Sequence, residues 1–292
     1  MPHCAMIQAG DIQAVVGDAS RNSQRGQQYC GLWSLTSRHR PFNAFGNSYA
    51  GLLPGEIRGK SPTLHVINDQ QCALERKADD TCPVDVRADY HIKAPNTIDH
   101  TLTFQDHRDV RAADCDHREV SWCCYMNCPD DSRLHFRADN DWHRYISAKH
   151  GSGSNIAPSY VSADQLEAWP NKSEWTQTHG PNWPFHWDRY DVRFDQPFYY
   201  GRLGEMIMIL VFDTPCWLRF FCSPSGGGPS LIADRTCPAW DFLWAIPNAD
   251  YQINREYTLR LRLIYKPFVS DDDVLDELHR TQTELGFETV TN

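Results

Sequence analysis

The sequence predicts an all-β fold, a large antiparallel β-sandwich with two helices, and three observations favour it. Apolar residues along most of the chain recur with a period nearer two than 3.6, the side-chain period of a strand. Clusters of Gly, Pro, Asn, Asp and Ser interrupt these segments, as expected for turns. Aspartate outnumbers glutamate by 28 to 10, which is typical of a loop-rich β protein because aspartate favours turns over helix interiors.

The expected strands follow one another at short intervals, without the alternation of strand and helix that builds a parallel sheet. The segment 119–126 is apolar almost throughout, which predicts a central strand covered on both faces. In chain order, the expected strands span residues 29–36, 47–53, 63–67, 84–92, 100–105, 119–126, 133–136, 142–147, 190–194, 205–212, 217–222, 242–246 and 256–265.

Two helices are expected, a short one over 163–169 that follows a capping Ser162, and a terminal one over 271–285. Ser270 and the three aspartates after it favour the beginning of a helix, where a side-chain acceptor and negative charge are stabilising. An apolar stripe on the terminal helix predicts that it packs on the outside of the sheets. The stripe comprises Val274, Leu275 and Leu278.

No Gly/Ser-rich, Pro-rich or charged linker divides the 292 residues, so we expect a single domain over 1–292. About a dozen strands in one domain exceed an immunoglobulin-like sandwich. The size and strand count resemble the large supersandwich of galactose-mutarotase-like proteins and the related sheet domains of some polysaccharide lyases. This resemblance implies sugar binding on a concave sheet face. The sequence carries no mutarotase signature from which catalytic residues transfer position by position.

Charge and hydropathy argue against several classes of function. The formal net charge is −10 and Lys and Arg are scattered along the chain, so no nucleic acid is expected as a partner. No apolar run approaches the roughly 18–20 residues that span a bilayer, and the first residues lack the basic and apolar segments of a secretory signal. We therefore expect a cytoplasmic protein without a membrane partner. Its acidic surface is compatible with a homo-oligomer.

The eleven cysteines, an odd number, contain no C-x-x-C pair. Free buried thiols in a reducing compartment are expected, with disulfides or metal ligation as alternatives. The thirteen histidines show no H-x-H or H-E-x-x-H spacing, so no cofactor is expected. A divalent metal held by distant strands stays open, because His143 with His150 and His179 with His186 each repeat at seven residues.

The middle of the chain is rich in aromatic rings. From Trp142 to Tyr200 there are five tryptophans, five tyrosines and four histidines. Flat aromatic faces beside imidazole, carboxylate and guanidinium groups suit a sugar, which has apolar C–H faces and a rim of hydroxyls. We expect a carbohydrate ligand resting on an aromatic platform. The candidate substrate-binding residues of this segment are Trp142, Trp183, Trp187, Arg189 and Tyr199.

General acid–base chemistry requires titratable groups beside that platform. His150 begins a Gly/Ser turn, and His179 and His186 belong to a segment stiffened by two prolines. Tyr200 near Arg202 is an arrangement used in eliminations next to a uronate carboxylate, where the cation binds the carboxylate and lowers the phenol pKa. Together with a glutamate on the central strand, the candidate catalytic residues are His150, His179, His186, Tyr200, Arg202 and Glu119.

Two further segments supply polar candidates for substrate binding. His100 opens a strand and could act as an oriented acid or base, with a hydrogen-bonded structural histidine as the alternative. Two aromatic strands flank a loop with three consecutive glycines at 226–228. This loop lacks the lysine and the strand-to-helix context of a phosphate-binding loop, so we expect a wide hairpin at the rim of the sandwich. Arg219 and Asp241 on these strands are then candidate polar groups of the cleft.

Two classes of function remain. The first is a carbohydrate-active enzyme, a hydrolase, lyase or epimerase that works by general acid–base chemistry on a sugar or oligosaccharide. The second is a non-catalytic glycan-binding or assembly module. The crowding of ionisable groups beside the rings favours the enzyme, whereas the lack of a strict catalytic motif favours the module. For every candidate residue, packing within the fold is the structural alternative.

Overall fold

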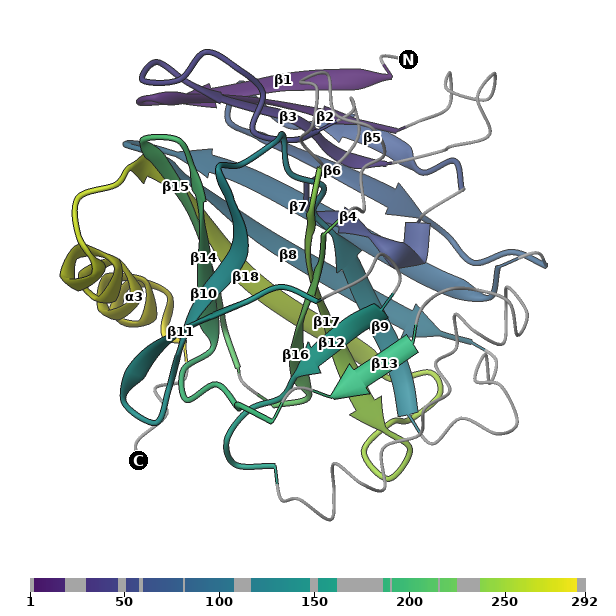
Figure 1. Ribbon diagram of the computed structural model, residues 1–292. Coiled ribbons are helices and arrows are strands. Elements are labelled where there is room, and N and C mark those ends of the chain that lie inside the picture. Colours follow the sequence, from purple (N-terminus) through teal and green to yellow (C-terminus); the bar gives the residue numbers. More distant parts are fainter. Residues whose placement is uncertain are drawn as a thin grey trace.

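The computed structural model describes residues 3–18, 30–46, 51–57, 60–80, 82–107, 117–147, 152–161, 186–189, 191–214, 216–224 and 237–287. At 53, 56, 117, 152–155 and 186–189 the backbone alone is described. These residues form three β-sheets and one α-helix (Figure 1). An all-β sandwich is therefore confirmed as the fold class.

The smallest sheet contains three antiparallel strands at the beginning of the chain. Their order is β1 (Cys4–Ala9), β2 (Ile12–Gly17) and β3 (Gly31–Ser37). In Figure 1 this sheet lies above strands β5 and β6 of the next sheet. The sequence analysis missed β1, where alanine, a weak strand former, occupies two of the six positions, and it also missed β2, which ends in glycine.

The largest sheet contains nine strands, and every neighbouring pair is antiparallel. It forms one of the two layers of the sandwich. In spatial order its strands are β11 (Asp141–Tyr145), β10 (Asp131–Ala138), β14 (Phe198–Leu203), β15 (Met206–Phe212), β18 (Glu256–Pro267), β8 (Thr97–Asp106), β7 (Val84–Lys93), β6 (Gln71–Arg76) and β5 (Thr63–Val66).

The second layer is a six-stranded sheet that includes the expected central strand near residue 120. Its strands pair antiparallel except for β12 and β13, which run parallel. In spatial order they are β13 (His186–Arg189), β12 (Ser152–Ile156), β16 (Leu218–Ser223), β17 (Ala239–Pro247), β9 (His117–Cys123) and β4 (Leu53–Pro54).

Aromatic side chains fill the space between the nine- and six-stranded sheets. Phe212 of β15 packs edge-on against Phe242 of β17, with ring centroids 4.8 Å apart. Trp122 of β9 stacks on Phe242 at 5.1 Å and meets Trp244 edge-on at 5.0 Å. Offset and edge-to-face geometries are the favoured ones for aromatic pairs. These rings therefore join the two layers into one core.

The helix α3 (Asp271–Leu285) covers the other face of the nine-stranded sheet, as expected from its apolar stripe. Ser270 caps it by accepting a hydrogen bond from the Asp273 N–H, and Gly286 ends it in the left-handed conformation. Val274 and Leu278 are buried against Ile209 of β15 and its neighbours. A short 3-10 helix, η2 (Gly55–Ile57), follows β4.

Several expected elements differ from the structure. β6 was missed because its sequence, QCALER, contains strong helix formers, and pairing with β5 and β7 overrides that preference. β14 was missed because Gly201 interrupts it; a Cβ there would lie 2.2 Å from the Trp240 ring. The prediction of a strand over 190–194 is wrong for residues 191–194, which do not form a strand. The helix expected at 163–169 lies outside the described residues.

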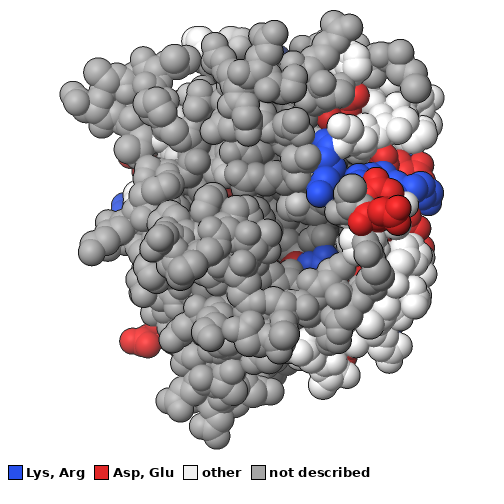
Figure 2. Space-filling view, turned by 90° about the vertical axis from the view of Figure 1, so that its right-hand side faces the viewer, with Lys and Arg blue, Asp and Glu red and all other residues white. Residues whose placement is uncertain are grey.

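Charged side chains on the surface are paired locally. Figure 2 shows Lys and Arg directly beside Asp and Glu at one edge of the face it presents. Ion pairs such as Arg87 with Asp89, at 2.8 Å, neutralise positive charge where it occurs. Within the described part of the chain, no helix is long and apolar enough to cross a membrane.

Candidate functional site

The outer face of the six-stranded sheet gathers three of the candidate polar residues. Along β17, Trp240, Phe242 and Trp244 point into the core, so Asp241 and Leu243 between them belong to the opposite face. The same alternation places further residues of β9 and β16 on that face, because their neighbours also belong to the core. We call these residues the outer-face patch: Glu119, Ser121, Arg219, Phe221, Asp241 and Leu243.

The strand register fixes how the patch is arranged. Arg219 is directly opposite Leu243, which is opposite Ser121 on the next strand. Phe221 is opposite Asp241. Arg219 and Asp241 are therefore diagonal neighbours on adjacent strands, with a spacing of about 7–8 Å for such pairs. The register therefore places both side chains on one face of the sheet.

Arg219 is a buried cation, only 2% exposed. Its Nη1 donates a hydrogen bond to the Leu218 carbonyl at 2.7 Å, which holds the side chain along the strand. Burial lowers the pKa of the guanidinium to about 10, while Tyr160 and Cys216 act in the opposite direction. At neutral pH Arg219 is still protonated, so it can stabilise negative charge that develops on a ligand.

The two carboxylates of the patch differ in surroundings. One oxygen of Asp241 accepts a hydrogen bond from the Cys124 backbone N–H at 2.7 Å, which orients the side chain. Glu119 lies opposite Ala245 on β17 and is 4% exposed. Its neighbour Arg118 faces the core and pairs with Asp106 at 3.0 Å. The ion pair of Arg118 with Asp106 thus stabilises the fold, whereas the Asp241 carboxylate is held in place on the outer face.

The edge strand β13 brings three more candidates to the same sheet. His186, Trp187 and Arg189 lie on it, and Arg189 is in register with Asn155, which is in register with Phe221. Their backbone positions therefore continue the sheet beyond β16. His150, His179 and Trp183 lie outside the described residues, so their roles stay predictions.

Tyr200, Arg202 and Trp142 lie elsewhere, on the face of the nine-stranded sheet that α3 covers. The Tyr200 hydroxyl donates to Asp271 at the beginning of the helix, at 2.7 Å. Trp142 packs edge-on against the Tyr200 ring with centroids 5.4 Å apart, and Arg202 lies 3.8 Å over the ring of Phe268. In Figure 1 this region and β13 are on different sides of the molecule.

The sequence analysis grouped Tyr200, Arg202 and His186 as catalytic candidates. The structure separates the first two from His186. The expectation of a lowered phenol pKa is also wrong. Burial and the hydrogen bond to Asp271 raise the pKa of Tyr200, and they outweigh the opposing effect of Arg202. The ring of His135 lies 4.5 Å from that of Tyr200. Burial disfavours the charged form of this imidazole too, and lowers its pKa to about 4. Sequence reasoning gave His135 no role.

His100 and Tyr199 lie in the core between the sheets. His100 is 1% exposed; its Nδ1 is 2.9 Å from the Asp89 carbonyl, and its Nε2 accepts from the Trp122 indole N–H at 3.0 Å. Burial lowers its pKa to about 4, so the ring is neutral at pH 7. The Tyr199 hydroxyl donates to the Trp240 carbonyl at 2.8 Å. This geometry matches the structural alternative considered for His100.

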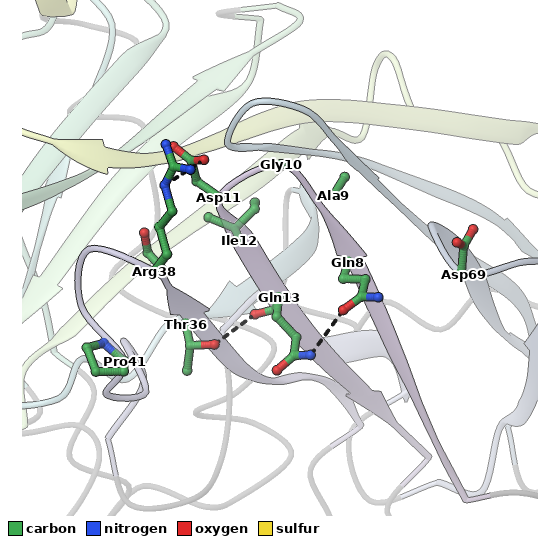
Figure 3. Close-up of a pocket in the computed structure, with 11 residues that line it drawn as sticks. Gln8, Ala9, Gly10, Asp11, Ile12, Gln13, Thr36, Arg38, Pro41 and Asp69 are labelled. Atoms are coloured by element: carbon green, nitrogen blue, oxygen red, sulfur yellow. Dashed lines mark hydrogen bonds and ion pairs between the residues drawn. The ribbon is translucent and has the colours of Figure 1, made fainter.

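A polar cavity of about 700 Å³ lies at the three-stranded sheet, and sequence reasoning missed it (Figure 3). The Gln13 amide donates to the Gln8 side-chain oxygen at 3.3 Å, and Arg38 pairs with Asp11 at 3.0 Å. Thr36 donates to the Gln13 carbonyl. The signal for this cavity was the weak alternation at 4–17, which places glutamines on the exposed side of two strands.

The part of the chain that the structure describes contains no preformed cluster of metal-ligating side chains. No group of three or more His, Cys, Asp or Glu side chains is arranged there to hold an ion.

No protein-family model matches the sequence, and a comparison with curated proteins finds no match. Similar solved structures include an aldose epimerase homologue from C. elegans, 8% identical over 91% of this chain and 99% of that chain, with a TM-score of 0.47. A galactose mutarotase related enzyme from Lactobacillus acidophilus is 11% identical over 92% and 98%, with a TM-score of 0.43. A candidate aldose 1-epimerase from Escherichia coli K12 is 9% identical over 91% and 99%, with a TM-score of 0.45. These matches agree with the architectural resemblance expected from the strand count.

Proposed function

We propose that the protein is a carbohydrate-active enzyme whose site is the outer-face patch. The observation that carries the proposal is the placement of Asp241 beside Arg219 on one face of the six-stranded sheet. A hydrogen-bonded carboxylate and a buried cation form a proton acceptor and a charge stabiliser. Phe221 and Leu243 of the same face, buried at 5% and 4% exposure, are the apolar residues against which the C–H face of a sugar ring would pack.

Within that class, the register favours proton transfer over hydrolysis. Glu119 is opposite Ala245, four residues from Asp241 along β17. Four residues at about 3.4 Å and one strand spacing of about 4.8 Å separate the two backbone positions by roughly 14 Å. In hydrolysis of a glycosidic bond the two carboxyl groups are about 5–10 Å apart. The Asp241 carboxylate bonds to the Cys124 N–H, at the end of β9 away from Glu119, so it does not shorten the backbone separation. We therefore favour an epimerase-type reaction. Asp241 accepts the proton of the anomeric hydroxyl, the C1–O5 ring bond breaks to give the open-chain aldehyde, and Arg219 stabilises the negative charge on the ring oxygen. Closure on the other face of the aldehyde and return of the proton from Asp241 to the new hydroxyl give the other anomer.

The test is a set of three product assays on the same protein. Exchange between the anomers of simple aldoses is followed by NMR, release of reducing ends from oligosaccharides reports hydrolysis, and ultraviolet absorbance of an unsaturated uronate reports elimination. We expect anomer exchange faster than the spontaneous reaction, without the other two products, and we expect Asp241→Asn to lower kcat/KM for this exchange by about 100-fold. Asp139→Asn is the matched control, because Asp139 is exposed with a φ of 52°, a conformation that asparagine tolerates.

A glycan-binding module without turnover is the second candidate, and the cavity in Figure 3 favours it. Its volume of about 700 Å³ lies within the common range for small-molecule sites. The amides of Gln8 and Gln13 suit hydroxyl groups. If this candidate holds, saccharides bind without product, Gln13→Ala abolishes binding, and Asp241→Asn leaves binding unchanged.

The cytoplasmic location and the homo-oligomer stay predictions. Size-exclusion chromatography with light scattering measures the oligomeric state directly, and a mass well above that of one chain supports the homo-oligomer.

A further inference from the structure

A pair of cysteines lies at the end of the six-stranded sheet, outside the outer-face patch. Cys128 follows β9 and Cys237 precedes β17, and their Sγ atoms are 3.7 Å apart. Both side chains are buried, at 5% and 2% exposure. The two sulfurs are in contact but not bonded, because a disulfide bond is about 2.0 Å long.

The sheet itself brings these cysteines together. Beyond the paired residues of β9 and β17, the ladder continues through a bridge between Tyr125 and Ala239. The Met126 N–H then donates to the Pro238 carbonyl at 2.8 Å. The contact between the sulfurs is therefore set by backbone register across 109 residues of sequence. Closing it into a bond requires the sulfurs to approach by about 1.7 Å.

We infer that Cys128 and Cys237 form a modification site, a dithiol that peroxide oxidises to a disulfide. In the first step one thiol reacts with hydrogen peroxide to give a sulfenic acid and water. In the second step the other sulfur attacks the sulfenic sulfur, forms the S–S bond and releases a second water. Two thiols thus lose two electrons and two protons, and one peroxide becomes two waters.

The surroundings of the two cysteines determine how fast they are oxidised and by which reagents. Burial, with Cys128 alongside, raises the pKa of the Cys237 thiol. Because the thiolate is the nucleophile, oxidation at neutral pH is slow and selects a small reagent over a bulky one. The bond would restrict the unfolded chain by closing a long loop. This inference is independent of the proposed function, since neither cysteine belongs to the outer-face patch.

Peptide mapping of the full-length protein tests the inference. The protein is treated with hydrogen peroxide, alkylated in denaturant and digested with trypsin. Cys237 is the one cysteine of peptide 236–255, whereas peptide 119–133 contains Cys123, Cys124 and Cys128. We expect these two peptides to be cross-linked, with fragmentation locating the bond at Cys128. The cross-link disappears after reduction, and it raises the midpoint of thermal unfolding by about 5 °C.

Cys123→Ser is the matched control, because it alters the same peptide and leaves the pair intact. We expect the cross-link to persist in Cys123→Ser and to be absent in Cys128→Ser. If either variant fails to fold, fragmentation of the wild-type cross-link still decides the question. The inference is overturned if Cys237 bonds to another cysteine, or if both thiols are recovered alkylated under conditions that oxidise the exposed Cys4.

Discussion

The two outer faces of the sandwich carry similar kinds of residue but use them differently. On the nine-stranded sheet, Tyr200 and His135 lie where α3 packs, and the Tyr200 hydroxyl donates a hydrogen bond to Asp271 of the helix. On the six-stranded sheet, Arg219 and Asp241 lie on the face away from the core, and α3 is on another side of the molecule (Figure 1). Burial does not distinguish the two faces, because Tyr200 is 3% exposed and Arg219 is 2% exposed. They differ in their hydrogen-bond partners: Tyr200 bonds to a side chain of the helix, whereas Asp241 is oriented by the Cys124 backbone N–H at the end of its own sheet.

The largest effect we expect separates the two faces by activity. Asp241→Asn should lower kcat/KM for an aldose by about 100-fold, equal to roughly 2.7 kcal/mol, because the proton acceptor is removed. Tyr200→Phe should leave kcat/KM within about twofold. Thermal unfolding checks that Asp241→Asn is folded; its amide oxygen can still accept from the Cys124 N–H. Equal losses of activity in both folded variants would contradict the distinction between the faces.

The next effect concerns the pH dependence of the free energy of unfolding, to which His135 on the α3 side of the molecule contributes. Burial lowers the pKa of His135 to about 4, whereas the unfolded value is about 6.5. Between these pH values the unfolded state binds more protons, so the free energy of unfolding falls as pH decreases from about 6.5 to 4. The contribution of His135 is about 2 kcal/mol over that window, and His100 in the core adds to the same decline.

Urea unfolding at pH 7, 5.5 and 4.5 measures this decline in the wild type and in His135→Gln. We expect a shallower decline in the variant. Asp131 faces His135 at 3.5 Å, but its pKa is lowered to about 2, so its own protonation acts below this window. Parallel declines in the two proteins would show that His135 titrates normally in the folded state.

A smaller effect compares adjacent residues of β14. Tyr199→Phe should destabilise the protein by about 2 kcal/mol, because the buried Trp240 carbonyl loses its partner. Tyr200→Phe should cost about 1 kcal/mol, because Asp271 is exposed and water can replace the phenol. Chemical denaturation of both variants gives the ordering. A larger loss for Tyr200→Phe would place Tyr200, not Tyr199, in the more demanding environment.

The smallest effect concerns the attachment of the helix. Ser270→Ala removes the acceptor of the Asp273 N–H and should cost about 1 kcal/mol or less. Activity should be unchanged, because the cap lies on the α3 side of the molecule. Circular dichroism during thermal unfolding measures the loss, and Thr283→Ala, late in the same helix, is a suitable comparison.

The local parts of the fold could be predicted from the sequence. The terminal helix was predicted with its observed bounds, because its cap and apolar stripe are contiguous signals. The strand expected at 84–92 matches β7, whose side chains alternate regularly between buried and half-buried. β1 and β6 were missed because their residues are weak strand formers or strong helix formers, and pairing with distant strands decides their conformation.

The site was less predictable, because it depends on register between distant segments. Arg219 and Asp241 were identified as candidates, but their diagonal register positions follow from pairing of strands that are separated by a long loop. Tyr199 and Tyr200 are adjacent in sequence, yet one faces the core and the other faces α3. Clustering of aromatic residues along the chain therefore could not show which rings share a surface.

A crystal structure of the protein with a bound monosaccharide tests the central claim most directly. We expect the sugar ring over Phe221 and Leu243, with a hydroxyl within hydrogen-bonding distance of both Asp241 and Arg219. Occupancy of only the cavity beside Gln8 and Gln13, with the outer-face patch empty at saturating sugar, would contradict the account.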